Sequence, residues 1–423
     1  MVSPAALDLT TSAPPAARRC RVLLVAPQPF FALRGTPINV RQMAKALCAA
    51  GYDVHLATYS VGEPVDIDGL TLHRAPAVPG VRHVPIGFSV RKLLMDAMLA
   101  LRVWTLLARH HFDVVHAVEE SIFFTLPAAA LRGVPIIYDM DSSISDQLEY
   151  SGVLRSTLVL RTVRSLERSV LRRVALVITV CRSLTDSVRE LDARVPIAQI
   201  EDCPLAEALR EPDRHAVDVL RHRYGLSGAR VVVYTGNLER YQGVDLLLEA
   251  FAMVAERCPE ARLLIVGGEA AQVDAARSDA AGCGIADRVI FAGPQPPAMM
   301  AELMALGDVL VSPRRSGSNT PLKLFSYMRS AVPIVATDLP THTNVLDPGT
   351  ALLCAPTARA LADAMTAVLT DPPRFRSLGA AARERVLRDY SPEMFARKLL
   401  DGYSSVLGGS VRADTFSTRA TSM

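Results

Sequence analysis

The sequence has no long hydrophobic run and no large net charge. A membrane-spanning helix needs about 18 uninterrupted apolar residues, and the longest candidate, 96–108, is interrupted by Arg102. The formal charge of +3 over 423 residues gives no reason to expect a nucleic-acid partner. We therefore expect neither a transmembrane protein nor a nucleic-acid-binding one.

The sequence also lacks paired cysteines. Its seven cysteines form no Cys-x-x-Cys motif and have no neighbouring histidine pattern, which is typical of reduced, buried thiols in a cytoplasmic protein. The first 20 residues are rich in Ala, Pro, Ser and Thr, and the basic pair Arg18 and Arg19 does not precede an apolar run. We do not interpret this segment as a signal peptide.

What the sequence does contain is a regular alternation of buried strands and amphipathic helices. Half of the residues are hydrophobic and 21% are charged, as in ordinary α/β proteins. In the first half, we predict a helix at 38–50 and strands at 21–26, 53–58, 112–116, 134–138 and 175–180. In the second half, we predict helices at 243–257, 297–306 and 321–330, and strands at 229–235, 261–266, 288–292, 308–312 and 333–337.

This alternation predicts the fold class α/β, with two Rossmann-like, doubly wound parallel-sheet domains that face a cleft. The pattern breaks at 195–213, which is rich in Pro, Asp and Glu, and we place the domain boundary there. A last helix begins with serine as N-cap and proline as first helical residue. The predicted division is a disordered N-terminus at 1–19, a first domain at 20–205, a second domain at 206–390, a final helix at 391–407 and a disordered tail at 408–423.

One loop of the second half has the features of a phosphate site: Ser316-Gly317-Ser318-Asn319-Thr320-Pro321-Leu322-Lys323. With Thr320 as N-cap, the free N–H groups and dipole of the following helix attract an anion, and Gly317 allows its close approach. Lys323 opposes the helix dipole, a cost that a bound phosphate would offset. The alternative is a capped surface helix with an incidental lysine.

A second loop of this kind, Tyr234 to Gly243, also connects a buried strand to an amphipathic helix. Gly236 and Gly243 free the backbone, and Arg240 can contact a diphosphate. Alone, this loop is equally consistent with a plain strand-to-helix turn.

In their order and spacing, these segments resemble the family-4 glycosyltransferases of the GT-B fold. The second half resembles the family's carboxy-terminal lobe at 234–243, 263–268, 289–293 and 320–337. The first half resembles its acceptor lobe at 34–37 and 113–116. The resemblance covers about residues 20–407. It implies a retaining transfer of a sugar from a nucleoside-diphosphate sugar to an acceptor, with no required cofactor or metal, and a final helix that crosses back to the first domain.

The resemblance also implies roles for individual residues. Expected to be catalytic are Asp141, Lys323 and Arg240. Expected to bind the donor are Gly236, Asn237, Gln242, Gly268, Arg314, Gly317, Ser318, Asn319, Thr320, Pro321, Leu322 and Ser326. Expected to bind the acceptor are Arg34, Gly35 and Thr36. Glu119 and Glu120 are further acceptor candidates because they follow the strand that ends at His116, and the alternative is that they are solvated loop carboxylates.

Several of these positions depart from the family's usual pattern. Ser318 and Ser326 stand where the family often has two glutamates. Asn237 and Gln242 stand where it often has an arginine and a lysine. We expect the missing charge to come from Arg240, Arg314 or Lys323.

Asp141 occupies a position at which the family commonly has a histidine near the transferred sugar. Together with Asp139 it also matches the Asp-x-Asp metal motif of the other main glycosyltransferase fold. Three residues match a motif by chance often, and we expect no metal.

Two stretches of the first half combine arginines with apolar residues at helical spacing. Arg91, Lys92 and Arg102 flank apolar residues in 93–101, and arginines recur at steps of three and four in 155–173. Such helices can rest on anionic lipid at the inner face of the membrane and bring a lipid-linked acceptor to the cleft. The alternative is a solvated basic face.

We therefore expect a glycosyltransferase of polysaccharide or glycolipid synthesis with a lipid-linked or oligosaccharide acceptor. One alternative is a nucleotide-sugar epimerase of the same fold, which would need no acceptor. Another is a non-catalytic nucleotide-sugar-binding protein, which the two serines leave open. A dehydrogenase is disfavoured because no Gly-x-Gly-x-x-Gly follows the first strand.

Overall fold

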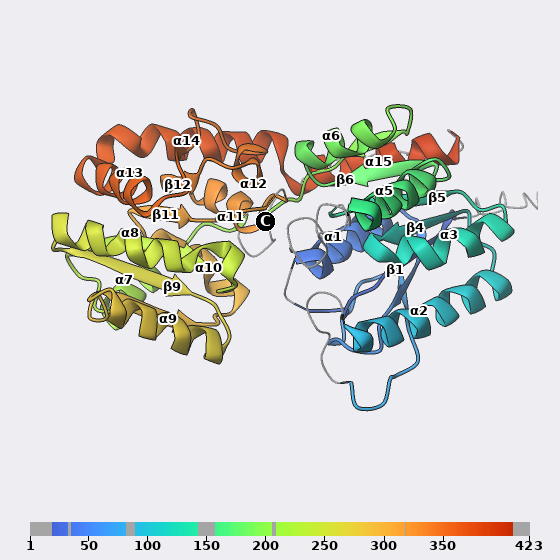
Figure 1. The fold of residues 1–423 in the computed structure, drawn as a ribbon, viewed down its shortest axis with the longest axis horizontal. Coiled ribbons are helices and arrows are strands. Elements are labelled where there is room, and N and C mark those ends of the chain that lie inside the picture. The colour runs from blue at the N-terminus through green and yellow to red at the C-terminus, as the bar shows by residue number, and fades with distance from the viewer. Residues whose placement is uncertain are drawn as a thin grey trace, which may run out of the picture.

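The structure, a computed structural model, describes residues 19–32, 35–81, 89–142, 157–204, 209–317 and 319–408. The described chain forms two α/β lobes, each built on one parallel sheet (Figure 1). Arg34, Ser318 and most of the two predicted disordered ends lie outside the described residues.

The sheet of the first lobe has seven strands in the order β3-β2-β1-β4-β5-β6-β7. They are β1 (Arg21–Ala26), β2 (Asp53–Thr58), β3 (Leu70–Arg74), β4 (Val114–Val118), β5 (Ile136–Met140), β6 (Leu176–Thr179) and β7 (Ile197–Gln199). The two edge strands, β3 and β7, were not predicted. Both are only partly buried, and neither has the continuous apolar run that marks a central parallel strand.

Helices cover both faces of this sheet. Successive residues of each strand point to opposite faces of the sheet, and each face has its own apolar cluster. One face is covered by α1 (Gly35–Ala49) and α15 (Pro392–Leu407). The other is covered by α2 (Val90–Arg109), α3 (Ile122–Leu131), α5 (Thr157–Leu171) and α6 (Arg182–Leu191).

Helix α1 begins three residues before its predicted start. The predicted acceptor residues Gly35 and Thr36 therefore lie in its first turn and not in a loop. Pro37 is compatible with this position, because the first residues of a helix need no N–H donor.

The second lobe has a six-stranded parallel sheet in the order β10-β9-β8-β11-β12-β13. Its strands are β8 (Arg230–Thr235), β9 (Ala261–Val266), β10 (Val289–Gly293), β11 (Val309–Ser312), β12 (Ile334–Thr337) and β13 (Leu352–Cys354). One face is covered by α8 (Val244–Arg257), α9 (Ala270–Gly282) and α13 (Ala358–Thr370). The other is covered by α7 (Arg214–Arg223), α10 (Met300–Ala305), α11 (Lys323–Ser330) and α14 (Pro372–Asp389), with the short α12 (Pro340–Thr343) nearby.

The final helix, α15, leaves the second lobe and packs on the first (Figure 1). Ser391 caps it by accepting a hydrogen bond from the N–H of Met394 at 3.2 Å, and Pro392 is its first residue, as predicted. Leu399 and Tyr403 are fully buried on the first sheet. The crossing back of this helix is confirmed.

Candidate active site between the lobes

The strand order of the second sheet reverses between β8 and β11, the position at which such sheets bind ligands. The chain leaves these two strands through the loops 236–243 and 313–322. Gly243, at the end of the first loop, has a φ of 73°, and a Cβ there would lie 2.0 Å from the carbonyl oxygen of Pro313 in the second. The two predicted phosphate loops are therefore in contact, and this contact requires glycine.

Gln242, Arg314 and Lys323 meet between these loops. Oε1 of Gln242 accepts a hydrogen bond from Nζ of Lys323 at 3.1 Å and lies 3.5 Å from Nε of Arg314. Gln242 is 6% exposed and Arg314 9%. Neither cation forms an ion pair with a carboxylate in the part of the chain that the structure describes.

Burial disfavours the charges of both cations. Desolvation, together with the charge of Arg314, lowers the pKa of Lys323 well below its usual value. Desolvation also lowers the pKa of Arg314. Nζ of Lys323 lies 4.0 Å from the centroid of the Tyr234 ring, which offsets part of this cost. Two confined cations that have no carboxylate partner among the described residues form a site suited to an anion.

Arg314 also shapes the second loop. Its Nη1 donates to the carbonyl oxygen of Asn319 at 3.1 Å and to Oγ1 of Thr341 at 2.8 Å. Thr341 in turn donates to the same carbonyl oxygen at 2.6 Å. Thr341 was not predicted as part of the site, because it lies 18 residues beyond Lys323, the end of the motif, in a separate helix, α12.

The start of the following helix differs from the prediction. Helix α11 begins at Lys323 and has Leu322 at its N-cap without a side-chain cap, so Thr320 is not the cap. Just before and within the first turn of this helix, the N–H of Leu324 donates a hydrogen bond to the carbonyl oxygen of Pro321, three residues earlier, at 2.9 Å. Oγ1 of Thr320 is buried and has no hydrogen-bond partner among the described residues.

Other residues predicted to bind the donor, and Arg240, which was predicted to be catalytic, lie around these loops. Asn237 and Arg240 are exposed in the first loop, Gly317 is exposed in the second, and Ser326 is partly buried on α11. At Gly268, after β9, a Cβ would lie 2.6 Å from the side chain of Leu238 in the first loop. Their contacts with a donor stay predictions.

The first sheet also reverses its order, between β1 and β4. Gln28 follows β1 and Glu119 follows β4, and Nε2 of Gln28 donates to Oε2 of Glu119 at 3.1 Å. Glu119 has a φ of 50°, which is uncommon for a residue other than glycine and occurs often at functional sites. Desolvation and the nearby charges of Asp141 and Glu120 raise the pKa of Glu119 to about 8.

Asp141 follows the next strand, β5, and is 9% exposed. Desolvation and the charges of Asp139 and Asp202 raise its pKa well above the usual value, while a hydrogen bond with Thr36 opposes the shift. Glu120, in contrast, has a cationic partner, because its Oε1 forms an ion pair with Nζ of Lys92 at 2.5 Å.

The two groups of residues meet where the lobes touch. Nδ2 of Asn319, in the second-lobe loop, donates to the carbonyl oxygen of Asp141 at 2.6 Å. A second contact joins the lobes where the N–H and Oγ of Ser183 donate to Oδ1 of Asn344 at 3.2 and 2.9 Å. A predicted donor residue, Asn319, and a predicted catalytic residue, Asp141, which are far apart in the sequence, are thus in contact.

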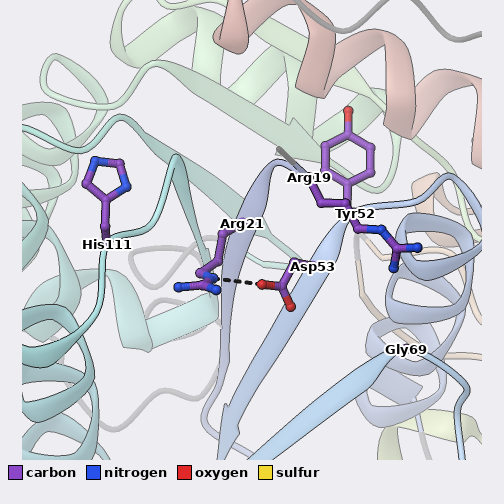
Figure 2. A pocket seen from close by; sticks show the side chains of 6 residues that line it. All are labelled: Arg19, Arg21, Tyr52, Asp53, Gly69 and His111. Carbon is purple, nitrogen blue, oxygen red and sulfur yellow. Dashed lines mark hydrogen bonds and ion pairs between the residues drawn. The ribbon is translucent and has the colours of Figure 1, made fainter. Parts of the chain in front are cut away.

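A pocket of about 500 Å³ lies elsewhere, at the amino ends of the strands of the first sheet (Figure 2). Arg21 and Asp53, the first residues of β1 and β2, face each other across it in an ion pair of 2.7 Å. Parallel sheets bind ligands at the opposite edge, so we place the site between the lobes. Among the described residues, no three His, Cys, Asp or Glu side chains are arranged to hold a metal ion, and no helix is long and apolar enough to cross a membrane.

Two family models match consecutive parts of the chain. Residues 34–202 match "Glycosyl transferase 4-like domain" and residues 229–371 match "Glycosyl transferases group 1". These ranges cover both lobes in the order of the family. The chain belongs to the family-4 glycosyltransferases.

Relatives of this family-4 glycosyltransferase match it over most of its length. The phosphatidyl-myo-inositol mannosyltransferase of Mycobacterium leprae is 26% identical and covers 91% of this chain and 97% of its own. The alpha-D-kanosaminyltransferase of Streptomyces kanamyceticus is 25% identical and covers 69% of this chain and 74% of its own.

Solved structures show the same fold. Sucrose-phosphate synthase from Thermosynechococcus elongatus has a TM-score of 0.75 at 22% identity, covering 93% of this chain and all (100%) of its own. Anabaena Alr3699/HepE, in complex with UDP and glucose, has a TM-score of 0.72 at 15% identity, covering 92% of this chain and 100% of its own. The predicted GT-B fold and glycosyltransferase activity are confirmed, and the relatives do not favour an epimerase or a non-catalytic binding protein.

Proposed function

We propose that this glycosyltransferase binds the diphosphate of a nucleoside-diphosphate sugar between the loops after β8 and β11, and transfers the sugar with retention to an acceptor held by the first lobe. The observation that carries the proposal is the pair of confined cations, Lys323 and Arg314, on either side of Gln242. We also propose that the first domain covers residues 20–205 and the second residues 206–390.

The chemistry of the transfer explains why cations belong here. The bond to the diphosphate breaks as negative charge develops on the leaving oxygen, and fixed cations and N–H groups stabilise that charge without reorganising. Lys323 is at the start of α11, where the uncapped N–H groups of the first turn add to the attraction. A bound diphosphate would favour the protonated form of Lys323, which burial by itself disfavours.

Structural neighbours support the nature of the donor. Anabaena Alr3699/HepE is described in complex with UDP and glucose and with UDP-glucose. For this chain, we propose a nucleoside-diphosphate hexose, bound without a required metal.

A thermal-shift screen of the full-length protein tests this donor site. Nucleoside diphosphates and their sugars, starting with UDP, GDP, UDP-glucose and GDP-mannose, are added separately. We expect at least one diphosphate to raise the melting temperature, because a ligand that binds only the folded state stabilises it. No shift with any nucleoside diphosphate would contradict the proposed function.

We further propose that the acceptor is lipid-linked or an oligosaccharide, and that the first lobe meets it at the inner face of the membrane. Relatives include mannosyltransferases of phosphatidyl-myo-inositol, and structural neighbours include WaaG, a glycosyltransferase involved in lipopolysaccharide biosynthesis. Two chemical features of α2 support membrane contact.

The first feature of α2 is an exposed apolar stripe along the helix. Val90, Leu94, Leu101 and Trp104 are 75%, 49%, 56% and 44% exposed and follow one another at helical spacing. The second is its basic flank, which includes Arg91 and Arg109. An apolar face bordered by basic residues binds anionic membrane surfaces.

Vesicle sedimentation tests this contact. We expect the protein to sediment with vesicles that contain anionic lipid and to remain in solution with neutral vesicles. Leu101→Ser should weaken sedimentation, whereas Val219→Ser, a control at an equally exposed position of the second lobe, should not. Equal sedimentation with both kinds of vesicle, or equal effects of the two variants, would contradict membrane contact through α2.

A further inference from the structure

The carboxyl edge of the first sheet carries an excess of hydrogen-bond acceptors. Gln28, Glu119 and Asp141 follow three adjacent strands, β1, β4 and β5, and therefore lie side by side at this edge. Asp139, near the end of β5, pairs in register with the last residue of β4. Glu119 and Gln28 are directly hydrogen-bonded at 3.1 Å.

Several of these acceptors are buried and unsatisfied. Oε1 of Gln28, both carboxylate oxygens of Asp139 and Oδ1 of Asp141 have no hydrogen-bond partner among the described residues. The three residues are 5%, 0% and 9% exposed. A buried acceptor without a partner is costly. The free oxygen of Gln28 is the clearest sign of a missing ligand. This side chain is uncharged, and its amide nitrogen is already hydrogen-bonded to Glu119.

The same edge gathers carboxyl groups that lack a cationic partner, which disfavours their ionised forms. Among the described residues, no lysine or arginine pairs with Glu119, Asp141 or Asp202, although Lys92 pairs with Glu120. His116 lies 3.6 Å from Asp139, but desolvation lowers the pKa of this histidine to about 3. His116 is therefore neutral, and the carboxyl groups raise one another's pKa values.

A ligand that suits this edge supplies hydrogen-bond donors and positive charge together. A protonated amine does both, since it offers three donors and no acceptor. A sugar hydroxyl could satisfy single oxygens but would not stabilise the ionised form of these carboxyl groups. A metal ion is the other ligand of such oxygens, but the described part of the chain contains no set of three ligating side chains arranged for one.

We propose that Gln28, Glu119 and Asp141 bind a protonated amine on the acceptor, so that the acceptor presents an amino sugar or a similar amine-bearing ring to the cleft. The inference rests on the proposed function, since it assigns the amine to the acceptor half of the site. Its place is defined by Asn319 of the donor loop, which contacts the backbone of Asp141 at 2.6 Å. The amine would then be held beside the donor sugar.

Binding of simple sugars to the full-length protein tests this inference. Glucosamine, glucose and N-acetylglucosamine are titrated at neutral pH and followed by saturation-transfer NMR, in the presence and absence of UDP and GDP. We expect glucosamine to bind about 10- to 100-fold more tightly than glucose, the range for hydrogen bonds to charged groups. N-Acetylglucosamine, which has the same nitrogen without the charge, should behave like glucose.

Two isosteric variants locate the amine site. Asp141→Asn and Glu119→Gln should each reduce the preference for glucosamine about tenfold, since each removes one carboxyl group that can form a charged pair with the bound amine. Asp401→Asn, at an exposed position of α15, is the matched control and should keep the full preference. Two separate variants keep the test valid if one of them fails to fold.

Three results would overturn the inference: no measurable binding of glucosamine, equal binding of glucosamine and glucose, or a preference that both site variants retain. Nucleoside-diphosphate binding is measured on the same samples. If no nucleoside diphosphate binds, the donor site on the second lobe is contradicted. If a diphosphate binds but glucosamine is not preferred, only the inference of an amine site is contradicted.

Discussion

At the scale of single residues, Lys323 combines a cost to folding with a gain for binding. The folded protein desolvates its charge beside Arg314, and Gln242 is its hydrogen-bond partner. Replacing a poorly compensated buried charge by an apolar side chain of similar length is often stabilising.

We therefore expect Lys323→Met to raise the free energy of unfolding by about 1 kcal/mol, measured by urea denaturation at neutral pH. The control is Lys398→Met, which breaks an ion pair with Glu201 and should not be stabilising. A clear loss of stability in Lys323→Met would show that this lysine serves the fold and not the ligand.

Glu119 should make the stability of the protein depend on pH. Its pKa is raised from 4.5 to about 8 in the folded state, so folding favours the protonated carboxyl group. Its contribution to stability is fully present below pH 4.5 and is lost as the pH rises towards about 8.

The corresponding prediction compares wild type with Glu119→Gln, which cannot ionise. Relative to wild type, the variant should gain unfolding free energy as the pH rises from 4.5 to 8. Urea denaturation at both ends of this range gives the difference. A constant difference across the range would mean that Glu119 ionises normally in the folded protein.

The sequence allowed the glycine-rich loops and Lys323 to be predicted, because glycine, proline and a lysine at a helix start have local meaning. It did not allow Gln28 or Thr341 to be predicted, since each joins the site only through contacts with distant segments. Thr320 was wrongly predicted as the helix cap. The helix starts at Lys323, after a turn in which the N–H of Leu324 bonds to the carbonyl oxygen of Pro321, and the residue types at these positions do not predict that turn.

At the scale of elements, the donor site depends on how closely the loops after β8 and β11 approach each other. Gly243 sets this approach, since a Cβ there would lie 2.0 Å from the carbonyl oxygen of Pro313. Gly284 has nearly the same φ, 72° against 73°, but open space around it. The two glycines thus separate the cost of backbone strain from the cost of steric overlap.

We expect Gly243→Ala to lower the free energy of unfolding by about 2–3 kcal/mol and to weaken nucleoside-diphosphate binding. Gly284→Ala should cost only about 1 kcal/mol and leave binding unchanged. Urea denaturation and calorimetric titration measure both quantities. Similar behaviour of the two variants would mean that the loop contact does not shape the site.

Most central strands could be predicted within two residues because parallel strands that are buried on both faces form continuous apolar runs. The edge strands β3, β7 and β13 could not. Their burial comes from the neighbouring strand and not from their own composition.

At the scale of the whole molecule, α15 connects the end of the second lobe to the core of the first. Its Tyr403 is fully buried, and the hydroxyl group shares a hydrogen bond of 2.7 Å with Nδ1 of His116 on β4. Tyr52 packs against the same ring, with 5.6 Å between ring centroids.

Removing the hydroxyl group in Tyr403→Phe should lower the free energy of unfolding of the first lobe by about 1–2 kcal/mol, because His116 loses its buried partner. Tyr52→Phe keeps the ring packing and should have less effect. Denaturation followed by tryptophan fluorescence reports on the first lobe, since the one tryptophan of the chain, Trp104, lies on α2. Equal effects would show that the hydrogen bond to His116 is not part of the attachment.

The two-lobed fold was predictable from the alternation of strands and helices along the chain. How the lobes meet was not, because the contact between Asn319 and the backbone of Asp141 joins residues 178 positions apart. This contact is what brings the donor loop to the acidic edge of the first sheet.

The most direct test of the account is calorimetric titration of the nucleoside diphosphate that binds best into wild type, Lys323→Met and Arg315→Met. Arg315 is the matched control, since it lies in the same loop but pairs with Asp245 at 3.1 Å. We predict that Lys323→Met weakens binding about 10- to 100-fold, as expected for a lost charge-assisted contact, and that Arg315→Met binds like wild type. Unchanged affinity in Lys323→Met, or an equal loss in both variants, would contradict a diphosphate site built on Lys323.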